Sequence, residues 1–235
     1  MRPLPTLILL PGLLNDRRLW QAQQKGLGDV AEVRIADLTQ DDSVEAMARR
    51  VLDSAPEHFL LGGLSMGGYV ALEIMRQQPA RVSRLALFDT SARPDAPEQR
   101  RRRQGLLAIC RSNPPERFHG VTPRLLPELV HEDHVRGPVG EVVMAMAREL
   151  GRDVFLRQQT AILARPDFRP GLGNIAVPTL VAVGEDDRVT PPDRSRDMAA
   201  SIPGARYHEV PRCGHLPPLE APEAVTALLR NWLAD

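Results

Sequence analysis

The segment Gly63–Gly68, with the sequence GLSMGG, constrains the fold of this 235-residue chain more than any other segment. An apolar run, Phe59–Leu61, precedes it, and Tyr69–Met75 follows with the pattern of a helix. Glycines stand two positions before and after Ser65, where a side chain would clash in a sharp turn. The segment therefore predicts a strand, a tight turn and a helix. We expect the Ser65 hydroxyl to be exposed at this turn, above a helix N-terminus that favours negative charge.

Apolar runs of strand length alternate with helical patterns along most of the chain. One helical pattern follows Asp42-Ser43, a typical N-cap, and another follows Pro222 at the end of the chain. This alternation predicts a mostly parallel sheet with helices on both faces. We expect its strands at Thr6–Leu10, Val33–Ile35, Phe59–Leu61, Val82–Phe88, Thr179–Val183 and Arg206–Val210.

The alternation is interrupted between residues 94 and 165, where no clear strand pattern occurs. Helical patterns cover Arg100–Cys110, Val139–Leu150 and Val154–Leu163, with a further piece rich in Pro and Leu near Leu125–Val130. We therefore expect a helical cap, residues 94–165, inserted into a core formed by residues 1–93 and 166–235. The run Arg100–Arg103 is interpreted as a solvated helix face, with an anion or partner site as the alternative.

The composition excludes several classes of function. Thirty basic residues balance thirty acidic ones, so there is no general reason to bind nucleic acid or an anionic membrane. No apolar stretch has the length of a transmembrane helix, and Pro11-Gly12 interrupts the apolar N-terminal run without a signal-peptide cleavage site. We expect a cytoplasmic protein, and the sequence does not indicate its oligomeric state.

Metal and disulfide patterns are lacking as well. The six histidines are scattered, and the two cysteines, Cys110 and Cys213, do not form a metal-binding or disulfide pattern. We expect no metal and no cofactor, and we interpret both cysteines as small buried thiols.

A nucleophilic serine needs a base and an acid that orients the base. In a strand–turn–helix architecture the chain order is Ser, acid, His, each on a loop after a strand. His215 follows Arg206–Val210, is preceded by a glycine and comes last, so it is the favoured base. Composition leaves four candidates for the acid, namely Glu185, Asp186 and Asp187 after Thr179–Val183, and Asp89 after Val82–Phe88.

The transition state of acyl transfer also needs donors for its oxyanion. One candidate is the backbone N–H of Met66, next to Ser65. The second is the N–H of Leu13, in the loop after the first expected strand, where Gly12 permits a close approach. Pro11 has no N–H and is excluded.

Together and in this order, these motifs resemble the α/β-hydrolase superfamily, in its small capped branch. The resemblance rests on Leu10–Leu13, Gly63–Gly68, Leu87–Asp89, Gly184–Pro192 and Gly214-His215 followed by Glu220–Glu223. It implies an α/β-hydrolase fold of about six parallel strands flanked by helices, without the first two family strands and with a helical cap after the sixth family strand. The family pattern selects Asp187, three residues after Gly184, and His215, so it implies a Ser65–Asp187–His215 triad.

The same resemblance implies hydrolysis of a small to medium carboxylic ester through an acyl-enzyme. An enol-lactone, a thioester or a carbon–carbon bond is the alternative electrophile for the same triad. A non-catalytic ligand-binding module and an interaction protein that uses its cap are alternatives of other classes. We expect the substrate pocket to be lined by Leu14, Trp20, Met66, Met144, Met146 and Phe155.

Overall fold

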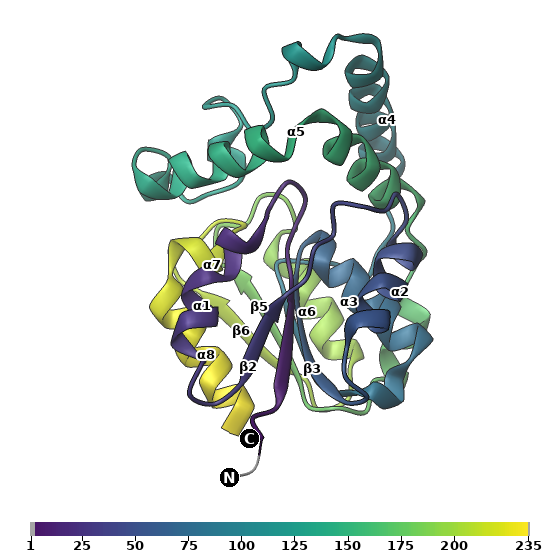
Figure 1. The fold of residues 1–235 in the computed structure, drawn as a ribbon, viewed down its shortest axis with the longest axis vertical. Coiled ribbons are helices and arrows are strands. Elements are labelled where there is room, and N and C mark those ends of the chain that lie inside the picture. The colour runs from purple at the N-terminus through teal and green to yellow at the C-terminus, as the bar shows by residue number, and fades with distance from the viewer. Residues whose placement is uncertain (1–2, 235) are drawn as a thin grey trace.

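The computed structural model describes residues 3–234 and contains one sheet of six strands, all parallel. The strand order is β2-β1-β3-β4-β5-β6, so β2 is added on one side of β1 as an edge strand, and β3 to β6 then extend the sheet on the other side (Figure 1). This confirms the expected six parallel strands. The strands are β1 (Thr6–Leu10), β2 (Glu32–Ile35), β3 (Phe59–Leu64), β4 (Val82–Phe88), β5 (Thr179–Gly184) and β6 (Arg206–Val210).

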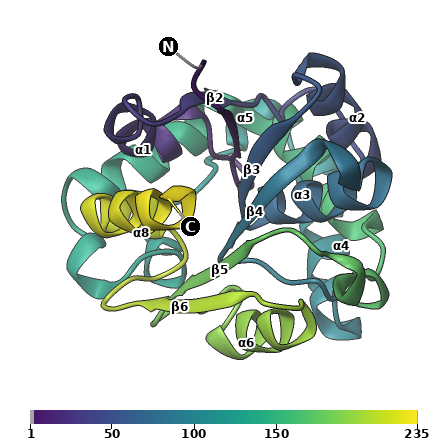
Figure 2. The same cartoon turned by 90° about the horizontal axis from the view of Figure 1, so that it is seen from below.

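Helices cover both faces of the sheet (Figure 2). In β1, Leu7 and Leu9 point into one apolar core, while Ile8 and Leu10 point into the other. Strands that are buried on both faces are apolar at every position, which explains why they read as continuous apolar runs. One face carries α1 (Gln21–Gly26), α7 (Pro217–Glu220) and α8 (Pro222–Ala234), and the other carries α2 (Val44–Ser54), α3 (Met66–Gln77) and α6 (Pro192–Ser201).

The chain between β4 and β5 leaves the sheet and forms only helices and turns within the described residues. It contains α4 (Pro97–Ser112), three short 3₁₀ helices, α5 (Pro138–Ala164) and a fourth 3₁₀ helix (Arg169–Asn174) before β5. Figure 1 shows these helices above the end of the sheet at which the strands finish. The two helices expected at Val139–Leu150 and Val154–Leu163 are the halves of α5, which is broken at Gly151 with a φ of 77°. The exact boundaries of a cap at residues 94 and 165 stay a prediction.

Local sequence signals account for several element boundaries. The Ser43 hydroxyl accepts a hydrogen bond from the Ala46 N–H at 3.1 Å, the N-cap expected before α2. Strand β3 continues to Leu64, so it leads directly into the turn at Ser65.

Among the described residues no helix combines the length and apolar content needed to cross a membrane.

Candidate active site

Ser65 lies at the turn between β3 and α3 in a strained backbone conformation. Its φ is 54° and its ψ is −114°, which non-glycine residues rarely adopt. The flanking glycines make the turn possible because a Cβ on Gly63 would lie 2.4 Å from the Gly67 carbonyl oxygen. A Cβ on Gly67 would lie 2.2 Å from the Leu10 carbonyl oxygen. The N-terminus of α3 therefore packs directly against the end of β1.

Hydrogen bonds to the neighbouring strand hold the strained turn in place. The Ser65 N–H donates to the Phe88 carbonyl at 3.0 Å, and the Thr90 hydroxyl donates to the Ser65 carbonyl at 2.8 Å. The same carbonyl accepts from the N–H groups of Gly68 and Tyr69 in the first turn of α3. Because these bonds fix the backbone on both sides, the direction of the Ser65 side chain is set before any substrate binds.

His215 and Asp187 come from the loops after β6 and β5 and form a buried pair. His215 Nδ1 lies 2.8 Å from Asp187 Oδ2. Asp187 also accepts hydrogen bonds from the Val189 N–H at 2.8 Å, the Thr190 N–H at 3.1 Å and the Thr190 hydroxyl at 2.7 Å. Burial raises the pKa of Asp187, but His215 and these donors outweigh burial and leave the pKa below its ordinary value. Asp187 is thus a carboxylate that engages Nδ1 and leaves Nε2 of His215 available.

The other three candidate acids lie in different environments. Glu185 and Asp186 are exposed. Asp89 is fully buried, and its Oδ1 accepts a hydrogen bond from the Gly184 N–H at 2.8 Å. Within the described residues its Oδ2 has no hydrogen-bond partner. Burial, followed by the nearby charge of Asp187, raises the pKa of Asp89 well above its ordinary value.

Asp89, Asp187 and His215 are also the one group of potential metal ligands found within residues 3–234. One ligand atom from each lies within 4.8 Å of the others. However, Asp187 and His215 are already hydrogen-bonded to each other, and four contacts occupy the Asp187 carboxylate. This arrangement suits proton handling better than metal coordination, because a metal would have to break the His–Asp bond.

Glu220 positions the loop that carries His215, a role that the sequence analysis missed. Its buried carboxylate accepts hydrogen bonds from the N–H groups of Gly214 and Leu216, both at 2.9 Å, and of His131 at 2.7 Å. The His215 N–H donates to the Leu129 carbonyl at 2.9 Å. The sequence analysis named Glu220 only as part of the family pattern, five residues after His215. The hydrogen bonds that explain this spacing are visible only in the structure.

The loop after β1 faces the N-terminus of α3. The Leu14 N–H donates to Gln158 Oε1 of α5 at 2.8 Å, so it is not free to bind an oxyanion. In the part of the chain that the structure describes, the Leu13 N–H has no protein acceptor. Met66 is the first residue of α3, where an N–H has no partner within the helix. Within residues 3–234, the two N–H groups expected from the sequence are therefore unpaired, and they lie at the same end of the sheet.

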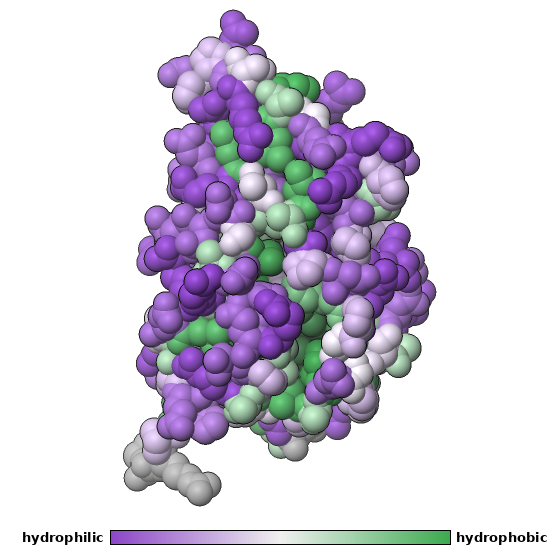
Figure 3. Space-filling model, turned by 90° about the vertical axis from the view of Figure 1, so that its right-hand side faces the viewer, coloured by the Kyte–Doolittle hydropathy of each residue, from purple (hydrophilic) through white to green (hydrophobic). Residues whose placement is uncertain are grey.

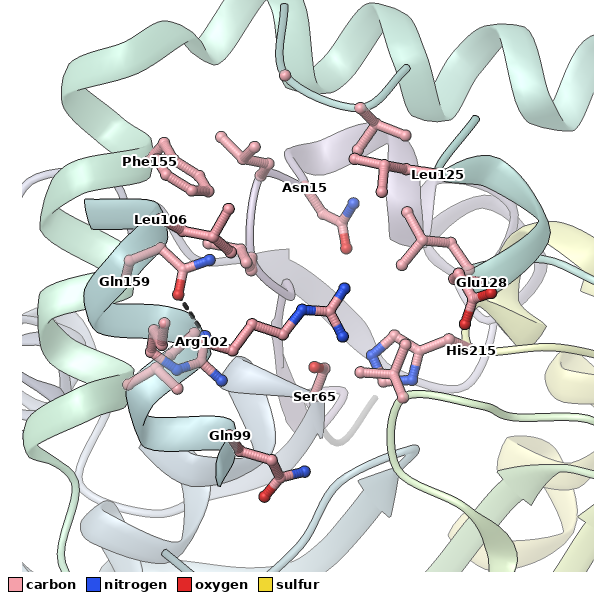
Figure 4. A pocket seen from close by; sticks show the side chains of 18 of the residues that line it. Asn15, Ser65, Gln99, Arg102, Leu106, Leu125, Glu128, Phe155, Gln159 and His215 are labelled. Carbon is pink, nitrogen blue, oxygen red and sulfur yellow. Dashed lines mark hydrogen bonds between the residues drawn. The ribbon is translucent and has the colours of Figure 1, made fainter. Parts of the chain in front are cut away.

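A cavity of about 680 Å³ lies between the cap helices and the sheet, with Ser65 and His215 on its wall. Figure 4 shows both side chains beside each other at one side of this cavity. Within the described residues no hydrogen bond joins Ser65 to His215, and such bonds often form only when substrate is bound. Of the residues expected in the pocket, Leu14 and Phe155 line the cavity, as does Leu13.

The expectation that Trp20, Met66, Met144 and Met146 line the pocket is wrong. Trp20 is fully buried against Phe88, with ring centroids 5.5 Å apart, and its Nε1–H donates to the Leu10 carbonyl. Met66 and Met146 are also fully buried in the apolar cores, and Met144 packs against one of them. Large apolar side chains gain more from complete burial than from an open cavity. Cys213 is buried as expected, whereas Cys110 is half-buried and lines the cavity.

The parallel sheet, the strained serine turn and the buried His–Asp pair define a class of protein. Residues 7–228 match the model of the Alpha/beta hydrolase family, and the chain belongs to this family.

Individual relatives are similar over nearly the whole chain. A putative non-heme bromoperoxidase, BpoC, from Mycobacterium tuberculosis is 32% identical over 94% of this chain and 81% of its own length. Among solved structures, a thermophilic esterase from Thermogutta terrifontis has a TM-score of 0.86 and 31% identity, covering 99% of this chain and 90% of that one. The enol-lactonase from Burkholderia xenovorans LB400 has a TM-score of 0.85 and 26% identity, covering 99% and 92%.

Proposed function

We propose that the protein is a serine hydrolase that cleaves a small to medium carboxylic ester through an acyl-enzyme. The observation that carries this proposal is the buried His215–Asp187 pair, 2.8 Å apart, on the same cavity as a serine held at a φ of 54°. Membership of a family whose relatives include an esterase and an enol-lactonase supports the choice of substrate.

His215 acts as the base and then as the acid. Its Nε2 takes the Ser65 proton as Oγ attacks the ester carbonyl carbon, and it gives that proton to the departing alcohol. A water molecule, deprotonated by the same nitrogen, then releases the carboxylic acid and restores Ser65. Asp187 holds the imidazole through Nδ1 and stabilises the imidazolium that forms.

The developing oxyanion is bound by the N–H groups of Leu13 and Met66. The Met66 donor also belongs to the N-terminal end of α3, whose dipole favours negative charge. The close approach of Gly67 to Leu10 brings this end of α3 next to the loop that carries Leu13.

Turnover of p-nitrophenyl esters by Ser65→Ala tests the proposal. We expect kcat to fall by at least about 10⁴-fold, because the nucleophile is lost. Ser195→Ala is the matched control, since Ser195 is buried in α6 away from the cavity. Activity of Ser65→Ala near the wild-type level would exclude the mechanism.

Two further measurements separate the alternatives. A fluorophosphonate probe that labels wild type but not Ser65→Ala indicates a hydrolase, and no labelling of wild type indicates a ligand-binding module. A panel of esters, lactones and acyl thioesters of matched chain length identifies the electrophile. An enol-lactone is the second candidate because of the similarity to the Burkholderia enzyme.

A further inference from the structure

Arginines outnumber acidic residues in the wall of the cavity, although the chain as a whole carries no net charge. Only two acidic residues line it, Asp95 and Glu128, against eight arginines. A cavity lined by charge of one sign raises the local concentration of ligands of the opposite sign. The arginines are Arg93, Arg102, Arg103, Arg117, Arg152, Arg165, Arg188 and Arg194.

Most of these arginines are already engaged by the protein. Arg103 and Arg165 both pair with Asp95, at 2.7 and 2.8 Å, so this buried acid neutralises part of their charge. Arg93, Arg152 and Arg194 pair with aspartates, and Arg188 donates to a carbonyl. Within the described residues, Arg102 and Arg117 are the two cavity arginines whose guanidinium groups make no hydrogen bond or ion pair.

Arg102 is placed by the helical period of α4. In the run Arg100–Arg103, Arg100 donates to the Leu163 carbonyl and Arg101 is exposed outside the cavity. Arg102 instead lines the cavity, together with Gln99 and Leu106 of the same helix. Figure 4 shows the Arg102 side chain extending from α4 into the cavity, over Ser65. The solvated face expected for the whole run thus applies to Arg101 but not to Arg102.

The rest of the cavity wall contains apolar side chains that the protein leaves uncovered. Five large apolar residues are exposed within residues 3–234, and four of them line this cavity. Figure 3 shows apolar side chains gathered among hydrophilic ones in the upper half of the molecule, on the side of α4. A cavity with apolar walls and an unpaired cation fits a ligand with an apolar chain and an anionic end. The four residues are Leu106, Ile109, Leu125 and Val189.

The positions of the charged side chains in the cavity indicate whether the acyl part or the alcohol part of an ester carries the anion. The leaving group must lie next to His215, which protonates it, so the acyl chain extends to the other side of Ser65. In Figure 4, Glu128 lies on the His215 side, while Arg102 extends from α4 on the opposite side. An anionic leaving group would approach Glu128, whereas an anionic acyl end would approach Arg102.

We infer that Arg102 forms a carboxylate-binding subsite and that the substrate is an ester whose acyl chain ends in a carboxylate. This inference rests on the proposed ester hydrolysis. The guanidinium offers two parallel N–H donors, a geometry that matches a carboxylate.

A matched pair of esters tests the inference, namely mono-p-nitrophenyl adipate and its neutral methyl p-nitrophenyl adipate analogue. We expect kcat/KM of wild type to favour the charged ester roughly tenfold, mainly through KM, because a charged hydrogen bond is made only to that ester. Arg102→Gln should bring this ratio close to one. Arg101→Gln, the same change one position earlier on α4, should leave the ratio as in wild type. The preference should also shrink in 0.5 M NaCl, since salt screens an accessible ion pair.

The inference is overturned if wild type does not prefer the charged ester in kcat/KM, or if Arg102→Gln keeps the wild-type preference. In either case, turnover of the neutral ester would still support the proposed hydrolase. If Arg102→Gln lowers kcat/KM only for esters with an anionic leaving group, such as 4-acetoxybenzoate, the assignment of Arg102 to the acyl side is overturned. Calorimetric binding of monomethyl adipate to Ser65→Ala, with and without Arg102→Gln, makes the test independent of turnover. Weaker binding in the double variant supports the subsite even if no ester is hydrolysed, and equal binding rejects it.

Discussion

At the scale of single residues, Asp89 and Asp187 show how environment separates two carboxyl groups. Both are buried within 4.8 Å of His215 atoms, but only Asp187 has enough donors to stay ionised. Asp89 has one donor, the Gly184 N–H, and a raised pKa. Two adjacent buried carboxyls do not both ionise readily, and Asp89 is the one whose pKa is raised.

Asp89→Asn should therefore stabilise the protein at neutral pH. In the unfolded chain Asp89 ionises near its ordinary pKa, whereas in the folded protein its pKa is raised. Folding then takes up a proton between these two pKa values, and stability falls as pH rises through that interval. Asparagine has no such proton uptake. We expect the Tm gain of the variant to vanish below the ordinary pKa of an aspartate and to grow as the pH rises above it.

Thermal unfolding of wild type and Asp89→Asn across this pH range measures the effect. Asp42→Asn, at an exposed position, is the control and should give no pH-dependent difference. Parallel Tm curves for wild type and Asp89→Asn would show that folding does not raise the pKa of Asp89.

Glu220 acts through the backbone on both sides of His215. Glu220→Leu removes the acceptor of three N–H groups, so the loop relaxes and His215 moves from its position. Misplacement of a catalytic group by about 1 Å costs roughly 10²-fold. We expect a fall of this size in kcat with a small change in KM.

Glu220→Gln keeps one acceptor oxygen and should retain an intermediate kcat. The exposed Glu223→Leu is the matched control. If Glu220→Leu and Glu223→Leu have the same kcat, Glu220 has no positioning role.

At the scale of elements, the turn between β3 and α3 depends on contacts with another strand. Gly67 is in contact with the end of β1, so the turn cannot open without moving β1. Strand β1 also carries the loop with Leu13. One close backbone contact therefore fixes the distance between Ser65, the proposed nucleophile, and the proposed oxyanion donor.

Gly67→Ala should abolish activity and lower the yield of folded protein, because its Cβ would lie 2.2 Å from the Leu10 carbonyl oxygen. Gly105→Ala makes the same change in α4, where no atom lies within 4 Å of the added Cβ. We expect Gly105→Ala to keep its activity and to gain about 0.5–1 kcal/mol in free energy of unfolding. Circular dichroism, denaturant unfolding and ester turnover measure these outcomes. An active, stable Gly67→Ala variant would contradict the packing of this turn.

At the scale of the whole molecule, the cap helices and the sheet are joined through buried polar groups. Gln158 of α5 accepts from the Leu14 N–H at 2.8 Å and donates to the Leu38 carbonyl at 3.1 Å. It thereby connects α5 to the loop after β1 and to the segment after β2. The shape of the loop after β1, which carries the proposed oxyanion donor, thus depends on the position of α5.

Gln158→Met should weaken both stability and catalysis. It leaves two buried backbone groups without partners, which costs about 1–3 kcal/mol and lowers Tm by roughly 3–10 °C. We expect kcat to fall about tenfold because the hydrogen bond to Leu14, which holds the loop that carries Leu13, is lost. The exposed Gln104→Met on α4 is the control. Wild-type kcat in Gln158→Met would show that α5 does not position the oxyanion loop.

The sequence by itself determined the elements and the local turn that presents Ser65. Three kinds of feature act over only a few residues: the two glycines around Ser65, the apolar runs and the helix caps. Their structural effect can therefore be predicted from a short segment of sequence. The chain order of Ser65, the acid and His215 could be predicted because each of these residues follows an expected strand. Local reasoning left four acids open, and the family resemblance selected Asp187 among them.

Only the tertiary structure decided which side chains face the cavity and which residues support the site. Trp20 and Met146 belong to cores because segments distant in sequence cover them, which no local pattern indicates. Gln158 meets Leu14 across 144 positions of the chain. Arg102 is separated from Arg101 only by the rotation of α4 against the cavity. Burial and long-range hydrogen bonds arise when distant segments pack together, and this is why they distinguish residues that look alike in the sequence.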